Sequence, residues 1–163
     1  TVISFVPIVT AAYRRMKLKR HFAIMPEKFI EWQKGVEPFR ITKHFKSDEF
    51  ECPCKRPECL TQRISHRLVW KLEIVRRMFK QPIFINSGYR CQAHQDFLSG
   101  FNSKVAKGIS QHTLGTAADI RCDKFLTHRD ALYSLCDELF NGLGRDIKFL
   151  HVDVREVKTR WVY

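Results

Sequence analysis

Residues 110–119 read Ser-Gln-His-Thr-Leu-Gly-Thr-Ala-Ala-Asp and place a histidine and a carboxylate seven residues apart. On one continuous helix, His112 and Asp119 would be separated by two turns, about 10 Å along the axis. One metal ion could not reach both, because zinc contacts to nitrogen and oxygen are about 2.0–2.2 Å long. If the two cooperate, the chain must fold back between them, and Gly115 is the residue that permits it. Residues 117–121 then form a short buried strand. The alternative is a polar loop with an ordinary hydrogen-bonded histidine.

A second stretch, residues 149–155 (Phe-Leu-His-Val-Asp-Val-Arg), alternates as a half-buried strand does. Its branched apolar side chains point to one face, and an imidazole, a carboxylate and a guanidinium point to the other. His112, Asp119 and His151 together make a set of two histidines and one carboxylate. Such a set suits a catalytic zinc whose fourth position is left to water.

The ordered motifs resemble a known family. Ser-x-His-x-x-Gly-x-Ala-x-Asp followed by His-x-Asp is similar to the zinc D-Ala-D-Ala carboxypeptidase and endopeptidase family, peptidase family M15, most of all to its compact subfamily common in bacteriophages and bacteria. Further matches lie on both sides of these motifs: Ser87–Arg90, His94, Asn141–Gly144 and Trp161. The likeness runs from about Phe39 to Trp161. It implies a Zn²⁺ cofactor and a peptidoglycan substrate.

The resemblance also indicates where a general base would lie. Several branches of the family place a glutamate three residues before the last ligand, but this chain has Lys148 there, and a cation cannot act as a base. Asp153 shares a strand face with His151, about 7 Å further along. We predict that Asp153 is the general base. Its alternative role is to orient a ligand or to pair with Arg155.

Arg90 matches the arginine that the resemblance assigns to substrate binding. A guanidinium there could clamp a terminal carboxylate or polarise the scissile carbonyl. The alternative is an ordinary surface ion pair. Three further residues have smaller expected roles: His94 behind a ligand, Ser110 in fixing the turn, and Trp161 either as a wall of the cleft or as filling at the edge of the core.

The pattern of elements predicts an α+β fold in one small domain, with a short antiparallel sheet that carries the zinc ligands and helices packed on it. Helices are expected where apolar residues recur at helical spacing, from Ile64 to Phe79, over 92–101 and after a capping box at 127–130. Gly142 and Gly144 are expected to end the last helix. Strands are expected at 83–86, 117–121 and 149–155.

The first 38 residues read differently from the rest. Residues 2–12 are mostly apolar, and residues 14–20 contain five basic side chains. A secretory signal has the reverse order, so none is recognised here. We predict a basic N-terminal arm at 1–38, which docks on a partner or an anionic surface, before a peptidase domain at 39–163. An ordinary solvated helix is the alternative, and residues 27–33 are expected to form one more short helix.

The chain has 163 residues, 44% hydrophobic and 28% charged, which suits one globular domain. Its formal charge of +12 predicts anionic partners. Peptidoglycan carboxylates and anionic wall polymers fit that charge. Nucleic acid fits as well, but it rests on charge alone and is the weakest candidate. No apolar run approaches the ~20 residues of a transmembrane segment.

Three of the six cysteines, Cys52, Cys54 and Cys59, are clustered, whereas Cys91, Cys122 and Cys136 are dispersed. Buried reduced thiols are one interpretation. A structural zinc that uses the cluster and a fourth ligand is another, although paired Cys-x-x-Cys spacing is absent. Disulfides are the third and would require an oxidising compartment.

The leading functional hypothesis is a zinc metallopeptidase that cuts peptidoglycan stem peptides at a bond to D-Ala or to a cross-bridge residue. A bacteriophage setting suits it, as an endolysin or a virion-associated wall-degrading protein, in the virion or in the host cytoplasm. Through the arm, other virion proteins become candidate partners. The alternative is a structural or binding module that keeps the fold but has lost catalysis, which Lys148 and the arm both favour.

Overall fold

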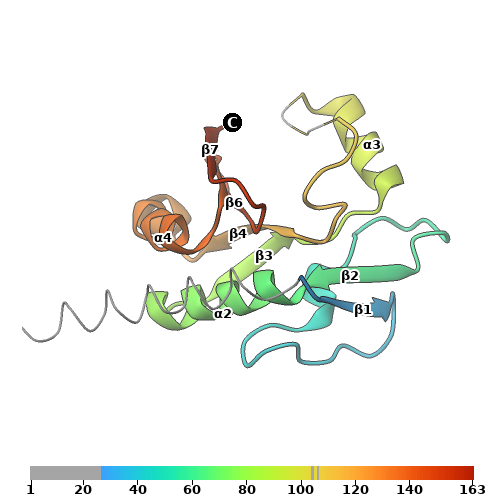
Figure 1. The fold of residues 1–163 in the computed structure, drawn as a ribbon, viewed down its shortest axis with the longest axis horizontal. Coiled ribbons are helices and arrows are strands. Elements are labelled where there is room, and N and C mark those ends of the chain that lie inside the picture. The colour runs from blue at the N-terminus through green and yellow to red at the C-terminus, as the bar shows by residue number, and fades with distance from the viewer. Residues whose placement is uncertain (1–26, 104, 106) are drawn as a thin grey trace, which may run out of the picture.

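The computed structural model describes residues 27–103, 105 and 107–163. Most of the predicted N-terminal arm, including the basic residues at 14–20, lies outside these residues. The described chain forms two sheets with three α-helices and one short 3₁₀ helix (Figure 1). In chain order the elements are β1 (Phe29–Gln33), η1 (Ser47–Phe50), β2 (Thr61–Ser65), α2 (His66–Phe79), β3 (Ile83–Ser87), α3 (Gln92–Phe101), β4 (Ala117–Cys122), α4 (Phe125–Leu139), β5 (Gly142–Arg145), β6 (Leu150–Asp153) and β7 (Thr159–Val162).

The larger sheet has five strands in the order β3-β4-β6-β5-β7. Its neighbouring strands are antiparallel except for β5 and β7, which are parallel at one edge. The smaller sheet is the antiparallel pair β1–β2. This is the predicted α+β fold, and the strands predicted around Asp119 and His151 lie next to each other at the centre of the larger sheet.

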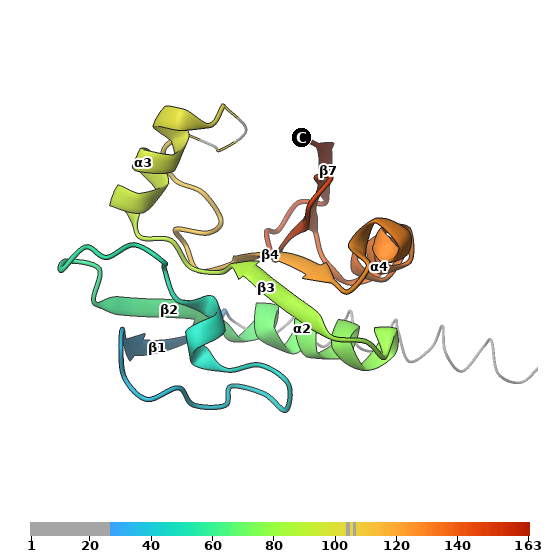
Figure 2. The ribbon, with the colours of Figure 1, turned by 180° about the vertical axis from the view of Figure 1, so that it is seen from behind.

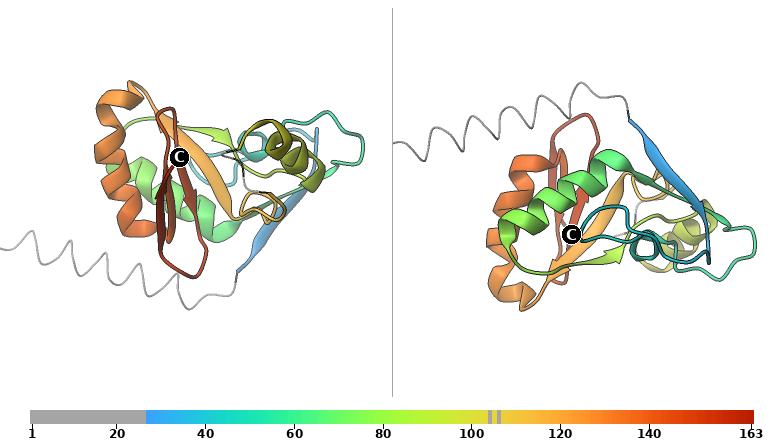
Figure 3. Two further views of the ribbon diagram at one scale, coloured as in Figure 1. Left: turned by 90° about the horizontal axis from the view of Figure 1, so that it is seen from above. Right: turned by 90° about the horizontal axis from the view of Figure 1, so that it is seen from below.

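The hydrophobic core lies between the larger sheet and two helices, α2 and α4. Leu68 and Leu72 of α2 and Leu132 of α4 are fully buried against Ile120 and Leu150 of the sheet. Burying a side chain of this kind stabilises the fold by about 1.5–3 kcal/mol. Figure 2 shows α2 beneath β3 and β4, while α3 stands on the opposite side. The views from above and below show α4 along one end of the molecule and the β1–β2 pair at the other (Figure 3).

The helix predicted from Ile64 begins slightly later. Ser65 is the N-cap of α2, and its hydroxyl accepts a hydrogen bond of 3.0 Å from the backbone N–H of Leu68. Ile64 therefore belongs to β2, where it is buried. The helix ends at Phe79, and its C-cap Lys80 has a left-handed backbone with φ of 59°.

The predicted helix over 27–33 is wrong, because residues 29–33 form strand β1, paired with β2. Trp32 on this strand is only 7% exposed and belongs to the core. Its indole N–H donates a hydrogen bond of 2.9 Å to Glu51 Oε1. Pairing with a distant strand outweighed the local helical pattern. The last part of the predicted arm is thus packed into the domain.

Two predictions about α4 are also wrong. The helix starts after Lys124, whose φ of 48° is left-handed, so Thr127 lies inside the first turn and forms no capping box. The helix ends at Leu139, before the glycines that were expected to stop it. Gly142 and Gly144 instead belong to β5, which lies between β6 and the edge strand β7.

Within the part of the chain that the structure describes, no helix has the length and apolar character needed to cross a membrane.

Candidate metal centre

One row of residues crosses the open face of the larger sheet. Asp119 pairs with His151, His151 pairs with Gly144, and Gly144 pairs with Trp161. Successive side chains on a strand point to opposite faces. Because Ile120 of β4 points into the core, Asp119 points to the open face, and its cross-strand partner His151 does so too.

The glycines of β5 make room for this row. A Cβ on Gly144 would lie 2.5 Å from the indole ring of Trp161, and a Cβ on Gly142 would overlap the carboxylate of Asp153. Since both positions lack a side chain, the Trp161 ring can lean towards His151, with ring centroids 5.2 Å apart. The same space admits the Asp153 carboxylate beside His151.

A tight turn brings the third residue to the row. Ser110 accepts a hydrogen bond from the backbone N–H of Thr113, and Gly115 adopts a left-handed φ of 74°. A Cβ on Gly115 would lie 2.9 Å from the carbonyl oxygen of Arg63. The chain therefore folds back at Gly115 as predicted, and His112 comes to lie over the sheet. Its ring is held by a 2.7 Å hydrogen bond between Nδ1 and the carbonyl oxygen of Gly88.

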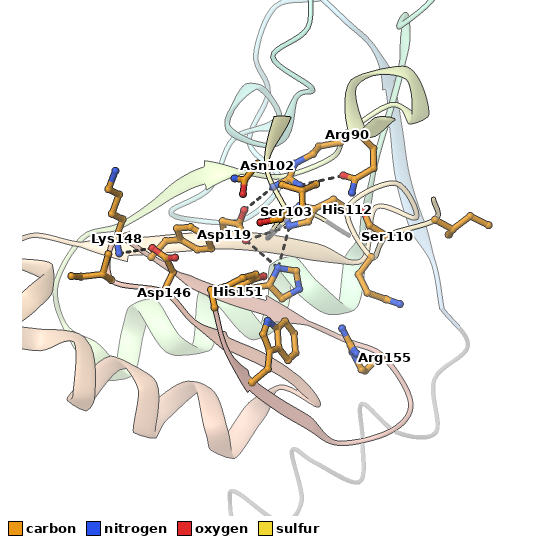
Figure 4. Close-up of a pocket in the computed structure, with 18 residues that line it drawn as sticks. Arg90, Asn102, Ser103, Ser110, His112, Asp119, Asp146, Lys148, His151 and Arg155 are labelled. Carbon is orange, nitrogen blue, oxygen red and sulfur yellow. Dashed lines mark hydrogen bonds and ion pairs between the residues drawn. The ribbon is translucent and has the colours of Figure 1, made fainter. Parts of the chain in front are cut away.

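The three predicted ligands meet at one point (Figure 4). His112 Nε2 lies 3.1 Å from His151 Nδ1 and 3.3 Å from Asp119 Oδ1, and the last two atoms are 3.0 Å apart. In a tetrahedral zinc site with bonds of about 2.0–2.1 Å, ligand atoms are separated by about 3.3 Å. The triangle thus has the size of one face of a zinc coordination tetrahedron.

The hydrogen-bond partners of the rings support a metal rather than a hydrogen-bonded cluster. His112 donates from Nδ1 to Gly88 O, which leaves a lone pair on Nε2. His151 donates from Nε2 to Asp153 Oδ2 at 3.1 Å, which leaves a lone pair on Nδ1. When both rings are neutral, these two lone pairs and Oδ1 of Asp119 converge as three acceptors without a donor between them. A cation at their centre removes this repulsion, so the residues present fit a zinc ion.

The electrostatics of the three groups agree with this geometry. Burial lowers the pKa of His112, so its ring is neutral at neutral pH and can present a lone pair. Burial alone would raise the pKa of Asp119, but the two histidines outweigh it and hold the pKa well below its usual range. For His151, burial is outweighed by Asp119 and Asp153, which raise its pKa. Binding of a metal at Nδ1 requires this nitrogen to be without a proton, so metal binding would compete with protonation of His151.

Asp153, the predicted general base, is fully buried. Besides His151 Nε2, its carboxylate accepts hydrogen bonds from Arg155 Nε at 2.8 Å and Arg155 Nη2 at 2.5 Å. Burial opposes ionisation, but these two partners hold the pKa of Asp153 well below its usual range. The contacts match the alternative role considered above, a carboxylate that orients a ligand. The role of base stays a prediction.

Arg90, the predicted substrate-binding arginine, lies against the centre with a side chain 12% exposed. Its Nη2 donates a hydrogen bond of 2.8 Å to Asp119 Oδ2, and its Nε donates one of 2.9 Å to Ser87 Oγ. Nη1 contacts Gln95 Oε1 at 3.3 Å. Arg90 also lines the pocket in front of the ligands. It therefore holds a ligand in place, and its contact with substrate stays a prediction.

The three ligands form the floor of a pocket of about 790 Å³. One wall comes from α3 and the segment that follows it, and the other comes from residues 146–149, Trp161 and Tyr163. Trp161 therefore lies in the wall, the first of the two positions considered for it. His94 is half-buried and lies outside the pocket lining.

Two titratable residues of the pocket, Asp146 and Tyr163, were missed by the sequence reasoning. Asp146, only 8% exposed, accepts a hydrogen bond of 2.9 Å from the backbone N–H of Lys148. Burial and the nearby charge of Asp119 raise the pKa of Tyr163 to about 12, so its hydroxyl keeps its proton at neutral pH. Tyr163 lies two residues after Trp161 of β7, and residues two apart on a strand share a face, so this spacing could have placed Tyr163 beside Trp161. No local pattern marked Asp146.

An α+β fold with two histidines and one carboxylate that could hold a metal ion, at the floor of a pocket, is the type of site found in hydrolytic metalloenzymes. The chain matches the family model described as Peptidase M15 over residues 43–153, more than half of its length, and it belongs to that family. This confirms the resemblance drawn from the motifs, at the level of the family. M15 peptidases are typically zinc-dependent metallopeptidases. A comparison with curated proteins finds no match.

Proposed function

We propose that this protein is a zinc-dependent peptidase that cleaves stem-peptide or cross-bridge bonds of peptidoglycan, as a D-Ala-type carboxypeptidase or endopeptidase. The observation that carries the proposal is the triangle of His112 Nε2, Asp119 Oδ1 and His151 Nδ1, with sides of 3.0–3.3 Å, at the floor of a pocket in an M15 domain.

The bound zinc would supply Lewis-acid chemistry, which polarises a carbonyl group and makes water more acidic. Hydrogen bonds within the chain hold the three ligand side chains in the orientation that zinc binding requires. Gly88 O fixes the ring of His112, Asp153 fixes the ring of His151, and Arg90 fixes the second oxygen of Asp119. Because each ligand has its own partner, the three lone pairs are held in place before substrate arrives.

The pocket offers groups for the substrate on both sides of the ligands. Arg90 and the Tyr163 hydroxyl are donors that could bind the scissile carbonyl oxygen as negative charge develops on it. Figure 4 shows Lys148 and Asp146 on one side of the ligands and Arg155 on the other. Lys148 is exposed at the rim, where an ammonium group suits a carboxylate of a stem peptide. Two carboxylates are candidates to receive a proton during hydrolysis: Asp146, which lines the pocket, and Asp153, which is fully buried against His151 and outside the pocket lining.

The biological setting that we favour is a bacteriophage endolysin or a virion-associated wall-degrading protein. It would act on the bacterial cell wall from the virion or from the host cytoplasm. A formal charge of +12 supports attraction to peptidoglycan and to anionic wall polymers. Other virion proteins are candidate partners of the N-terminal arm.

The second candidate is an M15-like structural or binding module without catalysis. Lys148 favours it, because this cation stands where several branches of the family carry the general base. Such a module would keep the metal centre and the pocket, but it would bind peptidoglycan without cutting it.

Hydrolysis of purified peptidoglycan tests the proposal, with zinc measured by elemental analysis in the same samples. Mass spectrometry of the soluble products would identify the cleaved bond, since released D-Ala marks a carboxypeptidase and larger muropeptides mark an endopeptidase. His112→Ala and His151→Ala should lose both the zinc of this centre and the products. Metal-loaded protein that binds peptidoglycan and yields no products would support the inactive module instead.

A further inference from the structure

We call the group of His112, Asp119 and His151 the peptidase centre. A second group of side chains with metal-ligand chemistry lies outside it. The sulfur atoms of Cys52, Cys54, Cys59 and Cys91 all lie within 4.8 Å of one another. Three of these residues come from the loop between η1 and β2, and Cys91 is the N-cap residue of α3. All four are free thiols. The fold thus brings the fourth ligand to the clustered cysteines from 32 residues further along the chain.

We infer that these four cysteines bind a structural zinc ion. The sulfur–sulfur distances carry the inference. Cys91 Sγ lies 3.8 Å from Cys52 Sγ and 3.6 Å from Cys54 Sγ. In a tetrahedral site with zinc–sulfur bonds of about 2.3 Å, neighbouring sulfur atoms are separated by about 3.8 Å. A disulfide would require about 2.05 Å. The four sulfur atoms are therefore spaced as they would be around one zinc ion.

The surroundings of the sulfur atoms are those of a metal-thiolate site. The backbone N–H of Cys91 donates a hydrogen bond of 3.4 Å to Cys52 Sγ. The side-chain amide of Gln62 lies 3.5 Å from Cys59 Sγ, and its Oε1 accepts a 2.8 Å hydrogen bond from the backbone N–H of Cys52. Gln62 is fully buried and so joins two of the four cysteines from inside. Donors aimed at sulfur stabilise thiolates, which are the form that binds zinc.

A cation also lies beside the cluster. Lys34 Nζ donates hydrogen bonds to the carbonyl oxygens of Cys52, at 2.6 Å, and Cys54. A zinc ion with four thiolates carries a net negative charge, and a nearby ammonium group offsets part of it. Zinc here would fasten a loop of irregular backbone to the start of α3, which is the usual task of a closed four-cysteine site.

This second centre is joined to the peptidase centre through a short segment. Arg90, next to Cys91, binds Asp119, and its backbone N–H donates a 3.2 Å hydrogen bond to the carbonyl oxygen of His112. Gly88, two residues earlier, accepts the hydrogen bond from the His112 ring. A metal ion that fixes Cys91 therefore also restrains the segment that positions two ligands of the other centre.

Zinc stoichiometry of the full chain, purified without chelators, tests this inference. The wild-type protein should carry two equivalents of zinc, and His112→Ala should retain one. Cys54→Ser should also lose one equivalent, whereas Cys122→Ala removes a buried cysteine of the hydrophobic core that is not part of the cluster and should keep both. Cobalt(II) bound to His112→Ala should show thiolate-to-cobalt charge-transfer absorption, and the added Cys54→Ser change should abolish it.

Two results would overturn the inference. One is a folded wild-type chain with at most one equivalent of zinc and a folded His112→Ala with none. The other is evidence of disulfides. The intact mass measured without reductant would then be lower than that of the fully reduced chain by two hydrogens for each disulfide, and the cluster cysteines would not react with an alkylating reagent. If Cys54→Ser fails to fold, the wild-type and His112→Ala measurements still decide. The zinc contents of the wild type and of His112→Ala do not depend on whether the protein hydrolyses peptidoglycan, so this inference can fail or hold independently of the proposed function.

Discussion

Gly142 lies directly across from Asp153 in the register of β5 and β6, and a Cβ at this glycine would overlap the Asp153 carboxylate. Asp153 in turn accepts a hydrogen bond from Nε2 of His151 and so leaves Nδ1 of that ring facing His112 and Asp119. The absence of one side chain on β5 is thus required for the position of a ligand on β6.

Gly142→Ala should displace the Asp153 carboxylate and weaken metal binding at the peptidase centre. Overpacking of a buried site costs typically about 1–3 kcal/mol. Loss of a partner that orients a metal ligand lowers affinity or activity by about 10–100-fold. Competition with a chromogenic zinc chelator and thermal unfolding would measure both effects. Gly100→Ala is the control, because a Cβ on this glycine of α3 meets nothing within 4 Å. Equal zinc affinity in both variants would show that Asp153 does not depend on the space at Gly142.

Asp153→Asn separates the two roles of this carboxylate. If Asp153 is the general base, the variant should keep its zinc and lose activity by about 10²–10⁴-fold. If it only orients His151, zinc affinity should fall together with kcat/KM, since an amide can present its N–H to the ring instead of an acceptor. Asp146→Asn is the matched variant, because Asp146 also lines the pocket and its carboxylate accepts a hydrogen bond from the backbone N–H of Lys148. Full activity in Asp153→Asn with a large loss in Asp146→Asn would assign the base to Asp146.

Arg90→Lys should lower kcat/KM on a stem-peptide substrate. Lysine cannot reproduce the three contacts that the guanidinium makes with Ser87, Gln95 and Asp119. Loss of one charge-assisted hydrogen bond costs about 1.5–3 kcal/mol, or about ten- to a hundredfold.

Zinc affinity distinguishes how Arg90 acts. A fall in kcat/KM with unchanged zinc affinity assigns Arg90 to substrate, and a fall in both assigns it to the support of Asp119. Arg121→Lys is the control, since Arg121 is exposed on β4, the strand of Asp119, and its guanidinium contacts the side chains of Asn86 and Phe84. An Arg90→Lys enzyme with the kinetics and melting temperature of the wild type would remove Arg90 from the site.

Two truncations should behave differently. Removal of residues 1–26 should leave a folded, zinc-loaded domain that sediments less with purified cell walls, because it lacks the five basic residues at 14–20. Removal of residues 1–38 also deletes β1, and with it Trp32 from the core. Loss of a buried tryptophan costs about 3–5 kcal/mol. Circular dichroism melting and zinc content would compare them. If the protein without residues 1–38 is as stable as the full chain, the domain boundary lies at residue 38. If the protein without residues 1–26 fails to fold, the arm is part of the core.

Several features of the peptidase centre could be derived from the sequence because they depend on local chemistry. The short range from His112 to Asp119 needs a reversal, and a glycine between them supplies the left-handed backbone that it requires. The alternating pattern around His151 indicates a strand whatever lies beside it. Helix α2 carries its own cap and its own apolar stripe. Spacing, residue type and the likeness to the M15 motifs were therefore enough to predict that His112, Asp119 and His151 lie together, the strands that carry Asp119 and His151, and the α+β class.

The remaining features were decided by contacts between segments far apart in the chain. Residues 29–33 have a helical pattern, but they pair with β2, and the hydrogen bonds of a ladder depend on a partner strand that local sequence does not reveal. Gly142 and Gly144 are typical of a helix end, yet they lie inside the sheet because bulky neighbours on β6 and β7 occupy their space. Cys91 stands apart in the sequence and reaches the other three cysteines only when α3 is placed beside the loop before β2. In each case the deciding energy is packing or pairing across the fold, which exists only once the tertiary structure has formed.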